Sequence, residues 1–168
     1  MRAILTVAAL ALAASVVVPR YAAQLQAGPP STATPGSATI AAPANSREVV
    51  ISPGRNGHFN VAGRVDGRRL DFMVDTGASV IALTERDAAA LGLHPAARDY
   101  TAAVKTANGI VRAAPVELDR VEIEDLEVRN VAALVMPDSA LSDNLLGLSF
   151  LKRLRRFEYE GGKLVLEQ

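Results

Sequence analysis

The sequence has 168 residues, no cysteine, and 18 basic residues that balance 18 acidic ones. This length suits one domain with appendages, and the absence of cysteine excludes disulfides, thiol catalysis and cysteine-ligated zinc. A net charge of zero without a clustered basic face argues against nucleic-acid binding. Two histidines are too few for a histidine-rich metal site, so we expect neither a metal nor a cofactor.

The N-terminal part of the chain predicts two segments that precede the folded domain. Residues 1–19 combine a basic start with an uncharged apolar run, which is typical of a signal peptide or short membrane anchor. No clear small-residue cleavage site follows, which favours an uncleaved anchor. Residues 20–46 are rich in alanine, proline and serine and predict a flexible linker, because such a composition cannot bury enough apolar surface to offset its backbone entropy. The folded domain is therefore expected at residues 47–168.

The first half of this domain predicts short strands separated by turns. Strands are expected, in chain order, at residues 48–52, 58–65, 68–74 and 80–83. An Asp-Gly pair between the second and third strands predicts a tight hairpin. Thr84 is expected to cap a short helix over residues 85–91, which Gly92 ends.

The second half continues the same pattern. A hairpin with an Asn-Gly turn is expected from residues 100–106 and 110–118. Strict alternation of polar and apolar residues predicts one strand over 121–128, and an apolar run predicts another over 131–136. A short helix at 148–154 and a closing hairpin at 157–166 complete the domain. Short strands at even spacing indicate a compact all-β barrel or sandwich.

A carboxylate stands directly after the apolar end of the third strand. The residues there are Asp75, Thr76, Gly77, Ala78 and Ser79. A charged side chain at the edge of a core does not stabilise the fold, so its presence suggests a function. Gly77 would allow a sharp turn after the strand because it lacks a Cβ. An ordinary strand-ending Asx turn with a satisfied carboxylate would explain the same residues without any function.

A second motif later in the chain supports a functional interpretation of the Asp75 stretch. Asp75-Thr76-Gly77 is followed later by Leu145-Leu146-Gly147 before a short helix, with a glycine-tipped hairpin between them. This arrangement resembles the retropepsin-like aspartic proteases, specifically the bacterial single-domain members with an N-terminal hydrophobic segment. The resemblance covers roughly residues 56–166. It implies a closed barrel with one or two short helices and an aspartic endopeptidase acting on polypeptides. It also implies a location at the periplasmic face of the inner membrane, or export with a cleaved signal peptide.

The implied chemistry requires a second chain. Hydrolysis by this route needs two carboxylates about 3 Å apart that share one proton. The sequence has one Asp-Thr-Gly, and the nearest alternative, Asp138-Ser139-Ala140, lacks both the glycine and the apolar approach. We therefore expect a symmetric homodimer with Asp75 at the two-fold axis. The apolar C-terminal strand 164–166 could extend a sheet across this dimer.

The resemblance also assigns roles to individual residues. It makes Asp75 the catalytic residue and gives Thr76 hydroxyl contacts that lock the two active-site loops together. It assigns active-site-loop or substrate-binding roles to Thr76, Gly77, Ala78, Ser79, Asn108 and Gly109. Asn108 and Gly109 would form the tip of a flap, although an ordinary hairpin end is an alternative. It assigns structural support beneath the loop to Leu145, Leu146 and Gly147.

The chain departs from the viral pattern at two positions. Retroviral members usually carry an acid where this chain has Ser79 and an arginine where it has Leu148, and these two residues pair. Both partners are absent together here, so neither leaves a buried charge unpaired. A catalytically inactive periplasmic peptide-binding domain with the same fold is the alternative function, and a tethered envelope structural protein would leave the Asp-Thr-Gly motif unexplained.

Overall fold

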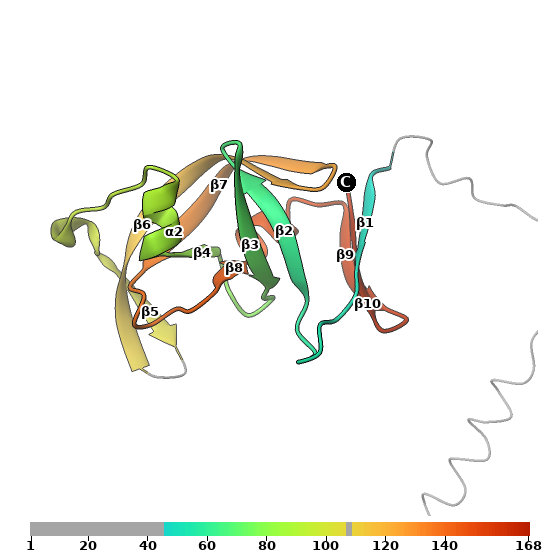
Figure 1. Ribbon diagram of the computed structural model, residues 1–168, viewed down its shortest axis with the longest axis horizontal. Helices are drawn as coiled ribbons and strands as arrows, with labels where there is room; N and C mark the ends of the chain where they lie inside the picture. The colour runs from blue at the N-terminus through green and yellow to red at the C-terminus, as the bar shows by residue number, and fades with distance from the viewer. Residues whose placement is uncertain (1–45, 107–108) are drawn as a thin grey trace, which may run out of the picture. The chain divides into compact units, whose positions relative to one another are not determined.

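The computed structural model describes residues 46–106 and 109–168, and six of its strands form a closed barrel (Figure 1). In order around the ring they are β2 (Asn60–Val65), β3 (Arg68–Val74), β8 (Asn144–Leu146), β4 (Ile81–Thr84), β7 (Leu126–Met136) and β6 (Gly109–Ile123). Strand β6 pairs back with β2 at Val65 and Val121, which closes the ring. The predicted all-β closed barrel is confirmed.

The barrel contains two parallel strand pairs, and one of them places the Asp-Thr-Gly motif. Strand β8 lies between β3 and β4 and runs parallel to β3, with Val74 opposite Leu146. Strand β4 runs parallel to β7. Because β3 and β8 end side by side, the residue that follows β3 meets the residues that follow β8. The two sequence motifs therefore converge at one edge of the barrel.

The barrel interior holds the main hydrophobic core. Its largest fully buried side chains come from both halves of the chain and include Phe72, Ile81, Leu118, Leu146 and Phe150. Phe150 belongs to the short helix α3 (Leu148–Leu151), which begins directly after Gly147. Burying several such side chains stabilises the fold by about 1.5–3 kcal/mol each. The residues around the second motif are thus packed into the core.

Helix α2 begins where the sequence predicts. Helix α2 (Glu85–Ala90) has Thr84 as its N-cap, and the Thr84 hydroxyl accepts the backbone N–H of Asp87 across 3.1 Å. Gly92 follows with a φ of +87°, a conformation that glycine adopts without strain. The chain then passes through a 3₁₀ turn, η1 (Ala97–Asp99), into β5 (Ala102–Thr106), which forms a hairpin with β6.

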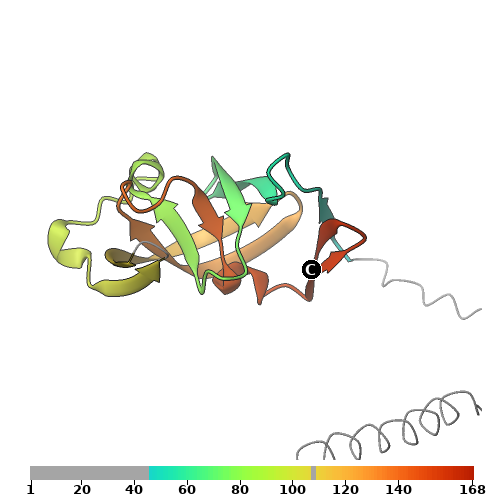
Figure 2. The same ribbon diagram turned by 90° about the horizontal axis from the view of Figure 1, so that it is seen from below.

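A second, three-stranded sheet lies beside the barrel, at the end opposite the β5–β6 hairpin (Figure 2). Its order is β1 (Glu48–Ile51), β10 (Lys163–Glu167) and β9 (Arg156–Glu160). Both edges of β10 are therefore paired within the chain. The prediction that residues 164–166 extend a sheet across a dimer is wrong for this strand, because β10 has no free edge to offer.

The expected single strand over residues 121–128 is also wrong. Strand β6 runs on through Ile123, the chain turns at Glu124 and Asp125, and β7 starts at Leu126. Glu124 adopts a φ of +50°, which is uncommon for a residue with a Cβ. No glycine, proline or asparagine marks this turn, and its signal in the sequence is the adjacent polar pair Glu124 and Asp125, which interrupts the alternation of polar and apolar residues.

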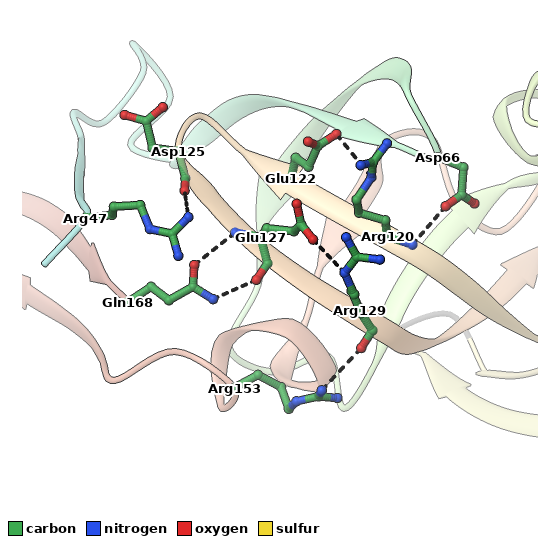
Figure 3. Close-up of polar contacts among 9 residues, drawn as sticks. All are labelled: Arg47, Asp66, Arg120, Glu122, Asp125, Glu127, Arg129, Arg153 and Gln168. Carbon is green, nitrogen blue, oxygen red and sulfur yellow. Dashed lines mark hydrogen bonds and ion pairs between the residues drawn. The ribbon is translucent and has the colours of Figure 1, made fainter. Parts of the chain in front are cut away.

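The β6–β7 turn is hydrogen-bonded to the two ends of the described domain (Figure 3). The Gln168 side chain accepts the backbone N–H of Glu127 across 3.0 Å and donates to its carbonyl oxygen across 2.6 Å. The Arg47 guanidinium donates to the Asp125 carbonyl oxygen across 2.9 Å. Arg47 and Gln168 also exchange backbone hydrogen bonds. These bonds fasten the three-stranded sheet to the barrel.

The predicted anchor, nearly all of the predicted linker and Asn108 lie outside the described residues. Within the described ranges, no helix is long and apolar enough to cross a membrane.

Candidate active site

Asp75 follows β3 directly and is half-buried at the barrel edge. Its backbone N–H donates to the carbonyl oxygen of Leu146 across 3.1 Å. One carboxylate oxygen of Asp75, Oδ1, accepts the backbone N–H of Gly77 across 2.8 Å, and the Asp75 carbonyl accepts the N–H of Ala78 across 3.3 Å. The main chain thus fixes both the position of Asp75 and the orientation of its carboxylate.

The structure gives the small size of Gly77 a different role from the predicted one. Its φ does not lie in the left-handed region, so the turn itself does not demand glycine. A Cβ at this position would lie 3.1 Å from Asp75 Oδ1. Because the N–H of Gly77 reaches that same oxygen, a larger residue would crowd the carboxylate that it holds.

The rest of the loop faces solvent. Thr76 and Ser79 are exposed and Ala78 is half-buried, while Leu148 packs against the core. Ser79 and Leu148, where retroviral proteases carry the paired acid and arginine, therefore lie in different environments. The loop presents small side chains to the surface, and Thr76 and Ser79 supply its hydroxyl groups.

The Leu-Leu-Gly motif lies directly beneath this loop. A Cβ on Gly147 would lie 2.2 Å from the Val80 carbonyl oxygen and 2.8 Å from the Ala78 carbonyl oxygen, which is far inside contact distance. Leu146 is fully buried, and the N–H of Leu148 donates to the Ala78 carbonyl across 2.8 Å. Only a glycine at position 147 lets the loop approach this closely.

The other two predicted site residues in the described ranges, Leu145 and Gly109, lie apart from each other. Leu145 is half-buried against a small cluster formed by Ala82, Ala113 and Met136. Gly109 begins β6 on the separate β5–β6 hairpin, where it is exposed with a φ of +119°. The Asp75 loop is thus hydrogen-bonded to residues 146–148, whereas Gly109 lies on the β5–β6 hairpin.

Two polar residues that support this site are absent from the sequence-based predictions. The Ser149 hydroxyl accepts the N–H of Ile81 across 3.0 Å and donates to the Ala132 carbonyl across 2.8 Å. Asn144 is 3% exposed and makes three hydrogen bonds. Ser149 lies between two apolar residues and Asn144 ends a short polar run, and no sequence pattern marks either one because their partners come from distant strands.

An open pocket of about 440 Å³ lies away from the Asp75 loop, beside α2 and the base of the β5–β6 hairpin, with Glu85, Tyr100 and Arg112 in its lining. Burial and a 2.5 Å hydrogen bond to Glu85 raise the pKa of Tyr100 to about 12. Among the described residues, no group of three or more His, Asp or Glu side chains could hold a metal ion.

Comparisons with known proteins show which family and which solved structure this chain resembles. Residues 61–153 match the family model of the gag-polyprotein putative aspartyl protease. A crystal structure of a retropepsin-like aspartic protease from Rickettsia conorii is similar with a TM-score of 0.66 and 40% identity, over 73% of this chain and 92% of that chain.

Two curated relatives are similar in sequence. An uncharacterized protein encoded in the cobV 5′ region of a Sinorhizobium species is 42% identical over 79% of this chain and 57% of its own length. An uncharacterized protein of Rickettsia prowazekii (strain Madrid E) is 40% identical over 71% of this chain and 51% of its own length. The chain thus spans about half the length of these curated relatives. On the matched motif region and the shared barrel, it belongs to the retropepsin-like aspartic protease family.

Proposed function

We propose that this chain is an aspartic endopeptidase that cleaves polypeptides as a homodimer, with one Asp75 from each copy. The observation that carries this proposal is the half-buried Asp75 carboxylate, oriented by the Gly77 N–H on a loop where Thr76 and Ser79 are exposed. Such a loop leaves room for a second copy to bring its own carboxylate close. A strand-ending turn without a function would not need the close packing of Gly147 beneath it.

The proposed reaction uses one water molecule and the shared proton of the pair. The charged carboxylate takes a proton from the water, whose oxygen attacks the peptide carbonyl carbon, while the protonated carboxylate donates a hydrogen bond to the carbonyl oxygen. The tetrahedral intermediate collapses as the C–N bond breaks, and a proton passes to the leaving nitrogen. Because two carboxylates this close cannot both be charged, the proposed site needs the one proton that they share, and we expect cleavage to be faster in acid.

The predicted N-terminal anchor adds a location to this proposal. If residues 1–19 hold the chain in the inner membrane, residues 20–46 would let the protease domain reach polypeptides on the periplasmic side, and a cleaved signal peptide would release it there. The substrate class proposed is extended polypeptide, because the exposed residues of the loop at the barrel edge would leave an extended chain room to approach Asp75.

A cleavage assay with a matched pair of variants tests the proposal. The full chain is incubated with an unfolded protein substrate across a range of pH, with and without a statine-type transition-state mimic. Asp75→Asn should abolish cleavage, whereas Asp119→Asn, which changes an exposed carboxylate on β6, should retain it. Full proteolysis by Asp75→Asn would overturn the proposal. A monomer that binds peptides and cleaves none would support the peptide-binding alternative instead.

A further inference from the structure

Asn144 is a polar side chain buried at the start of β8, with 3% of its surface exposed. Its Oδ1 accepts the backbone N–H of Thr84 across 3.0 Å. Its Nδ2 donates to the carbonyl oxygen of Asp71 across 3.2 Å and to Oδ2 of Asp87 across 2.7 Å. One amide group therefore connects β8 to β4, to β3 and to helix α2.

Strand β8 needs such connections because it is short. It has three residues, and its register with β3 runs from Phe72 opposite Asn144 to Val74 opposite Leu146. Its pairing with β4 rests on Ala82 opposite Leu145. A strand this short has few main-chain bonds to specify its register. The side chain of Asn144 adds one hydrogen bond toward each neighbouring strand, at the end where the pairing begins.

The register of β8 sets the position of the catalytic loop. The Leu146 carbonyl oxygen that accepts the N–H of Asp75 belongs to this strand, and Gly147 and Leu148 follow it directly. A shift of β8 along β3 would move this acceptor away from Asp75. It would also push Gly147 out of the narrow space beneath Ala78.

We propose that Asn144 is a positioning residue for Asp75: its amide holds β8 in register and thereby fixes the loop that carries the carboxylate. The effect on catalysis rests on the proposed protease function, whereas the effect on the loop geometry does not. A positioning error of about 1 Å at a reacting group can cost as much as about a hundredfold in rate, so a small shift of β8 is enough to be measured.

Several charged groups lie near the Asn144 amide, and they must be considered when a charge is introduced at this position. Asp87 also forms an ion pair with Arg86 across 3.5 Å, and the Asp71 side chain forms one with Arg69 across 3.8 Å. The charged residues that line the cavity at this side chain are Arg69, Asp71, Arg86, Asp87 and Asp143. Of these side chains, the Asp87 carboxylate is hydrogen-bonded to Asn144.

Asn144→Asp is the informative variant because it keeps the shape and the acceptor to Thr84 while it removes the N–H donors. At neutral pH the new carboxylate would face the Asp87 carboxylate across the former hydrogen bond and repel it. In acid the pair can share a proton, which restores a hydrogen bond. Asn130→Asp is the matched control, because exposed Asn130 also donates to a carboxylate, that of Glu117 across 3.3 Å, but it lies on β7.

Two readouts are measured for wild type and both variants. Amide hydrogen exchange measures the exchange rates of the backbone N–H groups of Asp75 and Leu148. The exchange rate of the Val121 N–H on β6 is the internal reference. Peptide cleavage reports kcat and KM across pH. In Asn144→Asp at neutral pH we expect faster exchange at Asp75 and Leu148 than at Val121, and a fall in kcat of about tenfold with KM little changed. Both effects should shrink as the pH falls.

The outcomes separate this proposal from the proposed function. If wild type cleaves nothing, the protease function fails and the exchange data alone decide the role of Asn144. Exchange and kcat that match wild type at every pH would overturn the positioning role. Faster exchange spread evenly over the barrel, or an equal effect in Asn130→Asp, would overturn it as well. If Asn144→Asp unfolds at neutral pH, the exchange pattern at the lowest pH where it is folded provides the same test.

Discussion

The Leu146 carbonyl oxygen accepts the backbone N–H of Asp75 across 3.1 Å, and this bond joins the two motifs of the chain. It exists because β3 and β8 are parallel neighbours that end at the same edge of the barrel. The carboxylate-bearing loop is therefore supported by a fully buried residue of a distant strand. Each residue beneath the loop can be tested for its part in this support.

Mixing wild type with an inactive variant should reveal whether two copies share one site. A dimer that contains one Asp75→Asn chain has a single catalytic carboxylate and should be inactive. At a constant total chain concentration, activity should fall with the square of the wild-type fraction if the copies exchange freely. The same mixing with Asp119→Asn, an exposed position, should leave activity unchanged. A linear decline with Asp75→Asn would show that each chain acts alone.

Gly147→Ala should strongly destabilise the fold. The added Cβ would lie 2.2 Å from the carbonyl oxygen of Val80 and 2.6 Å from its carbonyl carbon, so the backbone of the loop or of β8 must move. We expect a loss of about 3 kcal/mol in the free energy of unfolding, measured by urea denaturation. Gly54→Ala is the control, because its Cβ would meet the exposed side chain of Asn56 at 3.2 Å, which can move away. Equal midpoints for the two variants would contradict this account.

Ser149→Ala should destabilise the fold by removing one hydroxyl with two partners. The N–H of Ile81, a fully buried residue, and the carbonyl of Ala132 would both lose their hydrogen bond to this side chain. The exposed Ala132 carbonyl can bind water instead, whereas leaving the N–H of Ile81 unsatisfied costs about 1–3 kcal/mol in the free energy of unfolding. Thermal and urea unfolding of Ser149→Ala and of Ser139→Ala, an exposed serine, measure the difference. Matching stabilities would show that water replaces the hydroxyl.

Tyr100 should ionise late in an alkaline titration. Burial and the hydrogen bond to Glu85 raise its pKa from 10.0 to about 12. The folded state thus favours the neutral phenol, and this contribution to stability is present below pH 10 and lost as the pH rises toward about 12. Ultraviolet titration of tyrosinate is well suited because the chain has no tryptophan. The late step should disappear in Tyr100→Phe and persist in Tyr159→Phe; a late step that survives in Tyr100→Phe would refute the assignment.

Local signals in the sequence were sufficient for much of the fold. The Asp66-Gly67 hairpin forms as predicted, with φ values of +50° and +84°, and β3 has the expected bounds. Thr84 caps α2 as expected. These features depend on residues that are close in the chain, so their chemistry is readable there. The sequence does not predict the short strand β8, because its three residues are too few to show a period. The turn at Glu124 has only a weak local signal, the adjacent polar pair Glu124 and Asp125.

The sequence by itself determined that a carboxylate follows an apolar strand, that a Leu-Leu-Gly motif follows later, and that this combination is typical of one family. Only the tertiary structure decided what the two glycines contact: Gly77 lies against the Asp75 carboxylate, and Gly147 lies beneath Val80, where a Cβ would not fit. It also showed that β10 is paired on both edges and that Asn144 ties β8 to three other elements. The physical reason is that close approach and hydrogen bonding between distant strands depend on parallel pairing and register, which no stretch of neighbouring residues encodes.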